Sequence, residues 1–158
     1  MKEIRLCFVK RHPDAKLPCQ VYSDFETGDT GYDLTCVEDI TVKAGNSGIV
    51  LVGLDVGYIT PGYWFRIEVR SGLGFKNDLT NHFGVIDNQF RGNLDIKIYN
   101  QGKSDYTFKK GERIAQLVVY KLYQPKISWM NIEDVKETRR GSKGIGSTDK
   151  GSTDKVKI

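Results

Sequence analysis

Short apolar stretches with strand-like alternation recur through most of this 158-residue chain. The clearest is residues 94–99, where aliphatic side chains alternate with Asp95, Lys97 and Tyr99, as in a strand that buries one face. Similar stretches lie at residues 4–9, 40–42, 49–56, 63–69, 106–108 and 114–122. Glycine-containing turn sequences such as Pro61-Gly62 and Lys110-Gly111 separate them. The pattern predicts an all-β sandwich or barrel.

Helical signals are weak, and the apolar pattern stops before the end of the chain. Residues 73–77 and 132–137 predict one or two short helices. Later, Gly-Ser-Thr-Asp-Lys occurs twice in succession, from Gly146 and from Gly151. Such a segment does not bury enough surface to order alone. We predict a β domain at residues 1–138 and a flexible basic tail at residues 139–158, either a disordered end or a flap that orders over a ligand.

Charge is concentrated in that tail. The chain has 24 Lys and Arg against 20 Asp and Glu, a net charge of +4. Residues 139–158 contain six basic and two acidic residues, so the preceding body is neutral. A folded groove for nucleic acid would leave basic excess in the body as well. Salt-sensitive duplex binding through the tail alone stays a weak alternative, and we expect no stable nucleic-acid binding.

The apolar runs are too short for a membrane span, and the three cysteines show no pairing pattern. The most apolar run covers residues 49–54, and the first ten residues lack the apolar block of a signal peptide. Cys7, Cys19 and Cys36 are odd in number and lack the spacing of a zinc site. We expect a soluble, intracellular protein with free thiols and no membrane partner.

Four glycine-bearing segments contain candidate chemistry. Arg70-Ser71-Gly72-Leu73-Gly74 follows a predicted strand and suits either a phosphate at a helix start or a solvated turn. Asp87, in Gly84 to Gly92, is either a partly desolvated general base or a turn residue. Asp33, in Gly31-Tyr32-Asp33-Leu34, is equally a turn residue or a metal partner. Gln116 lies within an apolar strand and needs hydrogen-bond partners from backbone or ligand.

In this order, the segments resemble the five motifs of the trimeric dUTPase family, the dUTP diphosphatases. The corresponding stretches are residues 31–34, 70–74, 84–92, 111–117 and 140–148. The resemblance implies a jelly-roll-like β-barrel that assembles as a homotrimer with shared active sites. It also implies Mg²⁺-assisted hydrolysis of dUTP to dUMP and pyrophosphate, which keeps uracil out of DNA and supplies dUMP for thymidylate synthesis. The tail then becomes a lid delivered to a neighbouring chain.

The resemblance also implies roles for single residues. Asp87 would activate the water that attacks the α-phosphorus, and Asp33 would hold a metal-bound water as an outer-shell partner of Mg²⁺. The uracil and deoxyribose would be read by the hairpin, where backbone N–H groups reject cytosine. The expected phosphate ligands are Arg70, Ser71, Gly72, Gln116, Arg140, Ser147 and Thr148. The expected nucleoside contacts are Asn81, Gly84, Val85, Ile86, Phe90, Ile145 and Gly146.

Several positions depart from the family pattern. Phe90 replaces a tyrosine whose ring packs under the deoxyribose, so the apolar plate remains and the phenol is lost. Ile145 replaces a phenylalanine that stacks on uracil, a term worth roughly 0.5–1.5 kcal/mol. Lys143 and Asp149 occupy common glycine positions, which predicts a stiffer and more weakly closing tail.

Two further functions remain open from sequence. A dCTP deaminase shares the implied fold, but that family has an Arg-Ser-Ser string and a glutamate on the strand after the third motif, where this chain has Arg70-Ser71-Gly72 and Tyr99-Asn100. A dUTPase-like scaffold that binds a regulatory protein is the alternative from another class, motivated by Ile145 and the duplicated tail.

Overall fold

The computed structural model describes residues 3–82 and 84–144. The chain divides into one compact unit at Met1–Tyr123 and a second at Gln124–Ile158. This division lies before the predicted domain boundary at residue 138. The predicted boundary itself stays a prediction. Every described residue from 121 to 144 is exposed. No described helix combines the length and the apolar character needed to cross a membrane.

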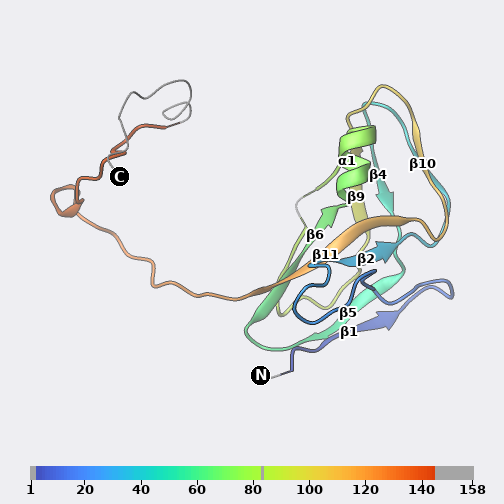
Figure 1. The fold of residues 1–158 in the computed structure, drawn as a ribbon, viewed down its shortest axis with the longest axis horizontal. Coiled ribbons are helices and arrows are strands. Elements are labelled where there is room, and N and C mark those ends of the chain that lie inside the picture. The colour runs from blue at the N-terminus through green and yellow to red at the C-terminus, as the bar shows by residue number, and fades with distance from the viewer. Residues whose placement is uncertain (1–2, 83, 145–158) are drawn as a thin grey trace. The chain divides into compact units, whose positions relative to one another are not determined.

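The first unit consists of antiparallel strands arranged in four small sheets (Figure 1). The largest has the order β2-β11-β6-β8, and the next has the order β4-β9-β7. Two-stranded sheets pair β1 with β5 and β10 with β3. The strand bounds are β1 Leu6–Lys10, β2 Tyr32–Thr35, β3 Ile40–Val42, β4 Ser47–Val50, β5 Leu54–Ile59, β6 Tyr63–Val69, β7 Leu79–Asn81, β8 Gly84–Ile86, β9 Ile96–Asn100, β10 Tyr106–Phe108 and β11 Arg113–Lys121.

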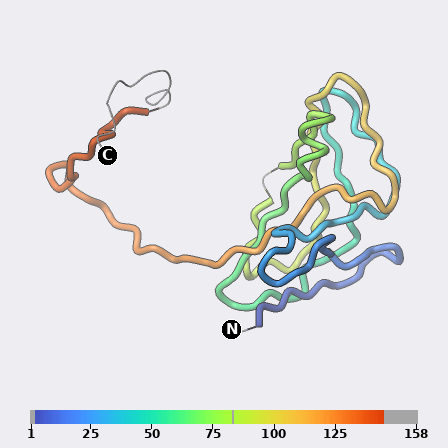
Figure 2. Tube along the Cα trace, viewed as in Figure 1, coloured from blue at the N-terminus to red at the C-terminus, as the bar shows by residue number. Residues whose placement is uncertain are grey.

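The all-β, jelly-roll-like prediction is confirmed by this architecture, although the sheets do not join into one closed barrel within the described residues. β1 pairs with β5 only, and its register shifts between Cys7 and Phe8. Figure 2 shows this first strand (blue) beside β5 (blue-green). A strand with one paired edge cannot close a barrel.

The prediction of one continuous strand at residues 49–56 is wrong. The chain forms two strands there, β4 and β5, separated by residues 51–53, which belong to no strand. Gly53 has φ +66°, and a Cβ atom would lie 2.6 Å from the Cβ of His12. A left-handed backbone with no room for a side chain interrupts an otherwise apolar run.

Both predicted helices occur as single short elements. α1 is Ser71–Asn77, and η1 is a 3-10 turn at Ile132–Asp134. α1 begins directly after β6 (Figure 1) and buries Leu73 alone. It ends at Asp78, which has φ 53° and whose N–H donates to the carbonyl of Gly74 at 3.0 Å, a left-handed helix end.

The core lies between the sheets and is almost wholly aliphatic and aromatic. Its fully buried side chains include Phe65 on β6, Phe108 on β10 and Ile98 on β9. On β6, the alternate residues Phe65 and Ile67 are buried and their neighbours are partly exposed. β11 buries the neighbouring residues Ile114 and Ala115, and again Leu117 and Val118, so it is covered on both faces, and Gln116 between these pairs is partly exposed.

Candidate functional site

Three motif segments meet where β6 ends and α1 begins. Asp33 on β2 lies directly opposite Gln116 on β11. Asp33 is buried and Gln116 is partly exposed. Arg70 follows β6, and Ser71 starts α1. A cavity of about 200 Å³ is lined by Val21, Asp29, Thr30, Gly31, Asp33, Arg70, Ser71 and Gln116. Residues 46 positions apart in sequence, Arg70 and Gln116, thus share one small polar cavity.

Asp33 pairs with two arginines. Its side chain is 11% exposed, its Oδ1 lies 3.0 Å from Nε of Arg70, and its Oδ2 lies 3.1 Å from Nη1 of Arg113. Two guanidinium groups around one carboxylate leave net positive charge. The other carboxylate at this cavity, Asp29, accepts backbone N–H bonds from Tyr22 at 3.0 Å and Val21 at 3.2 Å.

Arg113 was missed as a site residue by the sequence prediction. It lies inside the segment 111–117, of which the sequence prediction singled out Gln116 alone. A register shift between Arg113 and Ala115 in the β11–β2 pair turns its side chain to Asp33. The available signal was the presence of an arginine within a motif segment, residues 111–117.

A second, larger cavity adjoins the first. It measures about 670 Å³, and its lining includes Arg70, Ser71, Lys76, Arg113 and Glu112. The Glu112 carboxylate accepts the Tyr106 hydroxyl at 2.7 Å and the Lys109 backbone N–H at 2.9 Å. These bonds fix the position of the carboxylate. Three cationic side chains against this one carboxylate give the lining a net positive charge. Burial, followed by the bond to Glu112, raises the pKa of Tyr106 to about 12.

The Gln116 side chain is constrained by Gly31, two residues before its strand partner Asp33. A Cβ atom at Gly31 would overlap the Gln116 side-chain oxygen. The absence of a side chain at Gly31 therefore makes room for the Gln116 amide beside Asp33. Gly31 has no positive φ, so backbone conformation does not require glycine at this position. The contact with Gln116 does.

Five of the predicted nucleoside-binding residues lie on β7, on β8 or on the turn after β8: Asn81, Gly84, Val85, Ile86 and Phe90. β7 and β8 are not paired as a hairpin, because β7 pairs with β9 and β8 with β6. β8 is the edge strand of its sheet and pairs with β6 only. One side of its backbone is thus without a strand partner in the part of the chain that the structure describes. A Cβ atom at Gly84 would lie 2.9 Å from the Cβ of Ile67, so glycine permits the close β6–β8 approach. Val85 is 54% exposed and Phe90 is 39% exposed.

Asn81 already has backbone partners for its side-chain amide. Its Nδ2 donates to the carbonyls of Ile67 and His82, and its Oδ1 accepts the N–H of Val69, each at 2.8 Å. The bonds to Ile67 and Val69 join β7 to β6, and the other amide hydrogen is donated to the adjacent His82 carbonyl. In this conformation, a direct bond from Nδ2 to a base is not available.

Asp87 is exposed in the single chain, contrary to the expectation of partial desolvation. The residues after it hold the turn in place. Asn88 Nδ2 donates to the carbonyls of Thr60 at 3.0 Å and Tyr63 at 2.9 Å. The N–H of Phe90 donates to the Asp87 carbonyl at 3.0 Å. The turn thus presents a carboxylate on a fixed backbone.

The register of β6 separates Asp87 from the arginines. Ile86 pairs with Phe65, so Asp87 continues beside Trp64, six residues before Arg70. Six strand residues span about 20 Å. A general base must lie about 3 Å from its water, and that water about 3–3.5 Å from the atom it attacks. One copy of the chain therefore does not bring Asp87 to a phosphate held by its own Arg70.

The remaining predicted residues lie in the second unit. Arg140 is exposed, and its Nε donates to the Lys143 carbonyl at 3.1 Å. Ile145, Gly146, Ser147 and Thr148, like Asp149, lie outside the described residues. Their predicted roles stay predictions.

The donor set fits a metal ion only as an outer-shell site. The described residues contain no group of three or more His, Cys, Asp or Glu side chains able to hold a metal. Both Asp33 oxygens face guanidinium groups, so direct ligation would bring a cation against two cations. An ion held by a ligand's phosphates, with a water donating to Asp33, suits these residues.

Known proteins with this combination of motifs and fold are dUTPases. The dUTPase family model matches residues 18–149. The deoxyuridine 5'-triphosphate nucleotidohydrolase of Helicobacter pylori (strain P12) is 36% identical over 142 residues, covering 88% of this chain and 92% of that protein. The protein of the same name from Fowl adenovirus A serotype 1 is 35% identical over 155 residues, covering 98% and 83%. The solved Staphylococcus bacteriophage 80alpha dUTPase with dUPNHPP has a TM-score of 0.75 at 26% identity, covering 91% of this chain and 98% of that one.

Proposed function

This chain belongs to the dUTPase family, and we propose from that premise that it hydrolyses dUTP to dUMP and pyrophosphate. The observation that carries the proposal is the cluster of Arg70, Arg113, Ser71 and Gln116 around Asp33, which suits a polyanion. The similar phage 80alpha dUTPase is a complex with dUPNHPP, which supports a uracil nucleotide as the ligand.

The phosphate chain binds beside Asp33. Arg70 and Arg113 supply positive charge, and Asp33 fixes the direction of both guanidinium groups. Ser71 and Gly72 supply a hydroxyl and backbone N–H groups at the start of α1, and Gln116 supplies a side-chain amide. Mg²⁺ bound to the triphosphate would neutralise further charge. Asp33 would accept a hydrogen bond from one of its waters.

The base binds at the free backbone edge of β8. Gly84, Val85 and Ile86 offer N–H and C=O groups that suit the polar edge of uracil. A backbone N–H that meets the uracil O4 would meet an amine in cytosine, which leaves a buried donor unpaired at a cost of about 1–3 kcal/mol. Asn81 positions this edge by joining β7 to β6, and Phe90 supplies an apolar plate for the deoxyribose.

Asp87 accepts the proton of the attacking water. The chemistry needs in-line attack on the α-phosphorus with the charge of the phosphate chain neutralised, and no covalent intermediate. The Asp87 carboxylate is exposed in one copy, so its desolvation requires the closed, complete site. General-base catalysis of this kind typically contributes about 10²–10⁴-fold to the rate.

The complete site is shared between copies in a homotrimer. The support is the separation of about 20 Å along β6 between the Asp87 turn and Arg70. One copy contributes the phosphate cluster, and a neighbour contributes the Asp87 turn. Arg140, Ser147 and Thr148 of the tail bind the terminal phosphate, while Ile145 and Gly146 cover the base. Asp87 and Arg70 thus act on one nucleotide from two chains.

A pyrophosphate-release assay tests this function. Purified protein with Mg²⁺ is given dUTP, dTTP, dCTP and UTP in parallel, and ammonia release from dCTP is measured as well. We expect turnover of dUTP alone and no ammonia. Asp87→Asn should lower kcat by about 10²–10⁴-fold while the protein still binds a non-hydrolysable dUTP analogue. Full activity of Asp87→Asn, or no pyrophosphate from dUTP, contradicts the proposal.

A further inference from the structure

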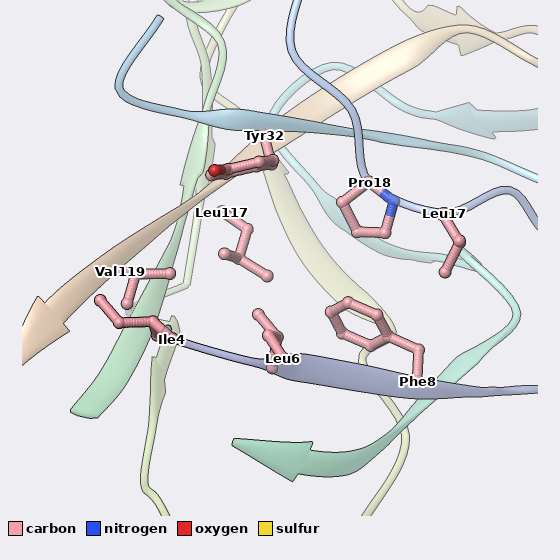
Figure 3. Close-up of a pocket in the computed structure, with 8 residues that line it drawn as sticks. All are labelled: Ile4, Leu6, Phe8, Leu17, Pro18, Tyr32, Leu117 and Val119. Atoms are coloured by element: carbon pink, nitrogen blue, oxygen red, sulfur yellow. The ribbon is translucent and has the colours of Figure 1, made fainter. Parts of the chain in front are cut away.

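The chain segment that begins with β1 lines two cavities of different character. The apolar groove of Figure 3 has a volume of about 330 Å³, and its lining includes Leu6 and Phe8 of β1 and, further along the chain, Leu17 and Pro18. Residues from the stretch between these two pairs, positions 10–16, line a second cavity of about 560 Å³. One short segment thus separates its apolar side chains from its charged ones.

The second cavity, here called the lysine pocket, is lined by three lysines and one carboxylate. The lysines are Lys10 at the end of β1, Lys16 and Lys110. Asp14 is the carboxylate, and its Oδ2 lies 2.6 Å from the Nζ of Lys110. In the part of the chain that the structure describes, neither Lys10 nor Lys16 forms an ion pair. The lining therefore has a net positive charge, and two of its cations have no counterion.

Apolar groups form the floor of the lysine pocket. Pro13 and Ala15 belong to the loop after β1, and Cys36 directly follows β2. Ala15 is 8% exposed and Cys36 is 2% exposed. Burial raises the pKa of the Cys36 thiol, so the thiol stays neutral and adds no negative charge. Cations beside such a floor attract an anion more strongly than the same cations surrounded by water.

The wall that carries Lys110 is held in place by backbone hydrogen bonds. The N–H of Lys110 donates to Oδ1 of Asp39 at 2.8 Å, and the N–H of Gly111 donates to the Cys36 carbonyl at 2.8 Å. In return, the Cys36 N–H donates to the Glu112 carbonyl at 3.0 Å. A ligand therefore meets a wall that is already formed, and its binding does not have to order this part of the chain.

We propose that the lysine pocket is a binding site for inorganic pyrophosphate. Lysine ammonium groups are common phosphate ligands, and each has several N–H donors, so the pocket suits a compact anion with many oxygen acceptors. Among the described residues that line the pocket, none is aromatic, so it has no surface on which a nucleoside base could stack. Pyrophosphate carries more negative charge than orthophosphate and therefore matches three ammonium groups better.

This site is distinct from the phosphate cluster around Asp33. The lysine pocket shares no lining residue with the 200 Å³ cavity that contains Asp33 and Gln116. It shares Gly111 alone with the 670 Å³ cavity that contains Arg113. The two anion sites can therefore be occupied at the same time, and the lysine pocket does not depend on the proposed function.

The three alanines of the chain are separate reporters for a test by nuclear magnetic resonance of methyl-labelled alanine. Ala15 lines the lysine pocket, Ala115 precedes Gln116 on β11, and Ala44 lines neither site. The variants Ala15→Ser and Ala44→Ser identify the signals. Pyrophosphate added to the wild-type protein at low ionic strength, where exposed charges are least screened, should shift the Ala15 signal until it saturates, and should leave Ala44 unchanged.

Two results of this titration overturn the proposal. A shift of Ala115 without a shift of Ala15 assigns the anion to the phosphate cluster alone. An Ala15 signal that does not move at about 10 mM pyrophosphate excludes a Kd near about 1 mM. In a parallel titration, ADP should bind at Ala15 no more tightly than pyrophosphate does, and tighter binding of ADP contradicts an inorganic ligand.

Substitutions of charged residues test the electrostatic basis of the site. Lys10→Gln combined with Lys16→Gln should raise the Kd for pyrophosphate about tenfold. Asp14→Asn should lower it about fivefold, because it removes the carboxylate that competes with the ligand for Lys110. Lys103→Gln, at an exposed lysine outside the pocket, is the control and should leave the Kd unchanged.

The substituted side chains are all exposed, so the circular-dichroism signal should match that of the wild type. A Kd that is indifferent to the double lysine substitution, or one that Asp14→Asn raises, overturns the proposal. None of these measurements involves dUTP turnover. Failure of the lysine pocket and failure of the catalytic proposal are therefore distinguishable.

Discussion

At the scale of single residues, Gly84 shows how backbone proximity constrains the site. A Cβ atom there would lie 2.9 Å from the Cβ of Ile67 and 3.0 Å from its carbonyl oxygen. Gly84→Ala should therefore destabilise the fold by about 1–3 kcal/mol, because β8 must move away from β6. Urea unfolding measures the change. Gly72→Ala, where an added Cβ atom meets nothing within 4 Å, is the matched control, and equal midpoints for the two variants would contradict the contact.

Arg113 is the main residue that the structure adds to the predicted site. Its guanidinium group shares Asp33 with Arg70. Arg113→Ala should lower kcat/KM for dUTP by about tenfold, corresponding to about 1.4 kcal/mol, since the side chain is 44% exposed and partly screened. Steady-state pyrophosphate release gives the value. Arg11→Ala removes an arginine that pairs with Asp55 instead, and its kcat/KM should equal that of the wild type.

At the scale of elements, the turn between β10 and β11 depends on a neutral tyrosine. Burial and Glu112 raise the pKa of Tyr106 to about 12, whereas an unfolded tyrosine titrates near about 10. The stabilisation from the neutral phenol is full below pH 10 and is lost as the pH rises towards 12, because the unfolded chain releases the proton first. The melting temperature should therefore fall across this range.

The matched variants for this pH effect are two phenylalanine substitutions. Tyr106→Phe should be less stable at neutral pH, since it loses the 2.7 Å bond to Glu112, and its melting temperature should depend less on pH between 10 and 12. Tyr58→Phe, at an exposed tyrosine of β5, should retain the wild-type slope. Parallel slopes for Tyr106→Phe and the wild type would rule out Tyr106 as the titrating group.

The sequence predicts strands best where alternation extends over the whole element. β6, β3 and β10 have the predicted bounds, because each is a β-branched or aromatic run between turn residues. The predicted strand at residues 49–56 is wrong because the space around Gly53 is set by His12, which is distant in sequence. Short strands such as β7 and β8 depend on their pairing partners β9 and β6, and three residues carry too little periodicity to reveal them.

The candidate site was predictable in its residues more than in its geometry. The order of the segments associated Asp33, Arg70 and Gln116 with one another, and the structure places them around one cavity. Register information was required for the rest. Strand pairing determines two features of the site. The Asn81 amide hydrogen-bonds to the backbone of β6, and the Arg113 side chain points to Asp33. No local pattern in a single sequence reports such pairing.

At the scale of the whole molecule, the proposed sharing of one site between copies predicts complementation between inactive variants. Arg70→Ala and Asp87→Asn should each be inactive when expressed alone. When the two variants are co-expressed in equal amounts, they should recover about a quarter of the wild-type activity per site. In a randomly mixed cyclic trimer, about one site in four combines an intact Arg70 from one chain with an intact Asp87 from its neighbour. Pyrophosphate release from the purified mixture measures the recovery. Activity no greater than the average of the two single variants would indicate that each copy forms its own site.

In the proposed trimer, the distance between the two ends of β6 also makes turnover depend on the protein concentration. When the assembly dissociates on dilution, each separated chain keeps its folded strands but loses one half of the machinery. The rate then falls faster than the protein concentration does. Because a nucleotide that touches two chains also holds them together, it delays this loss. Substrate abundance would therefore regulate the lifetime of the assembly as well as its saturation.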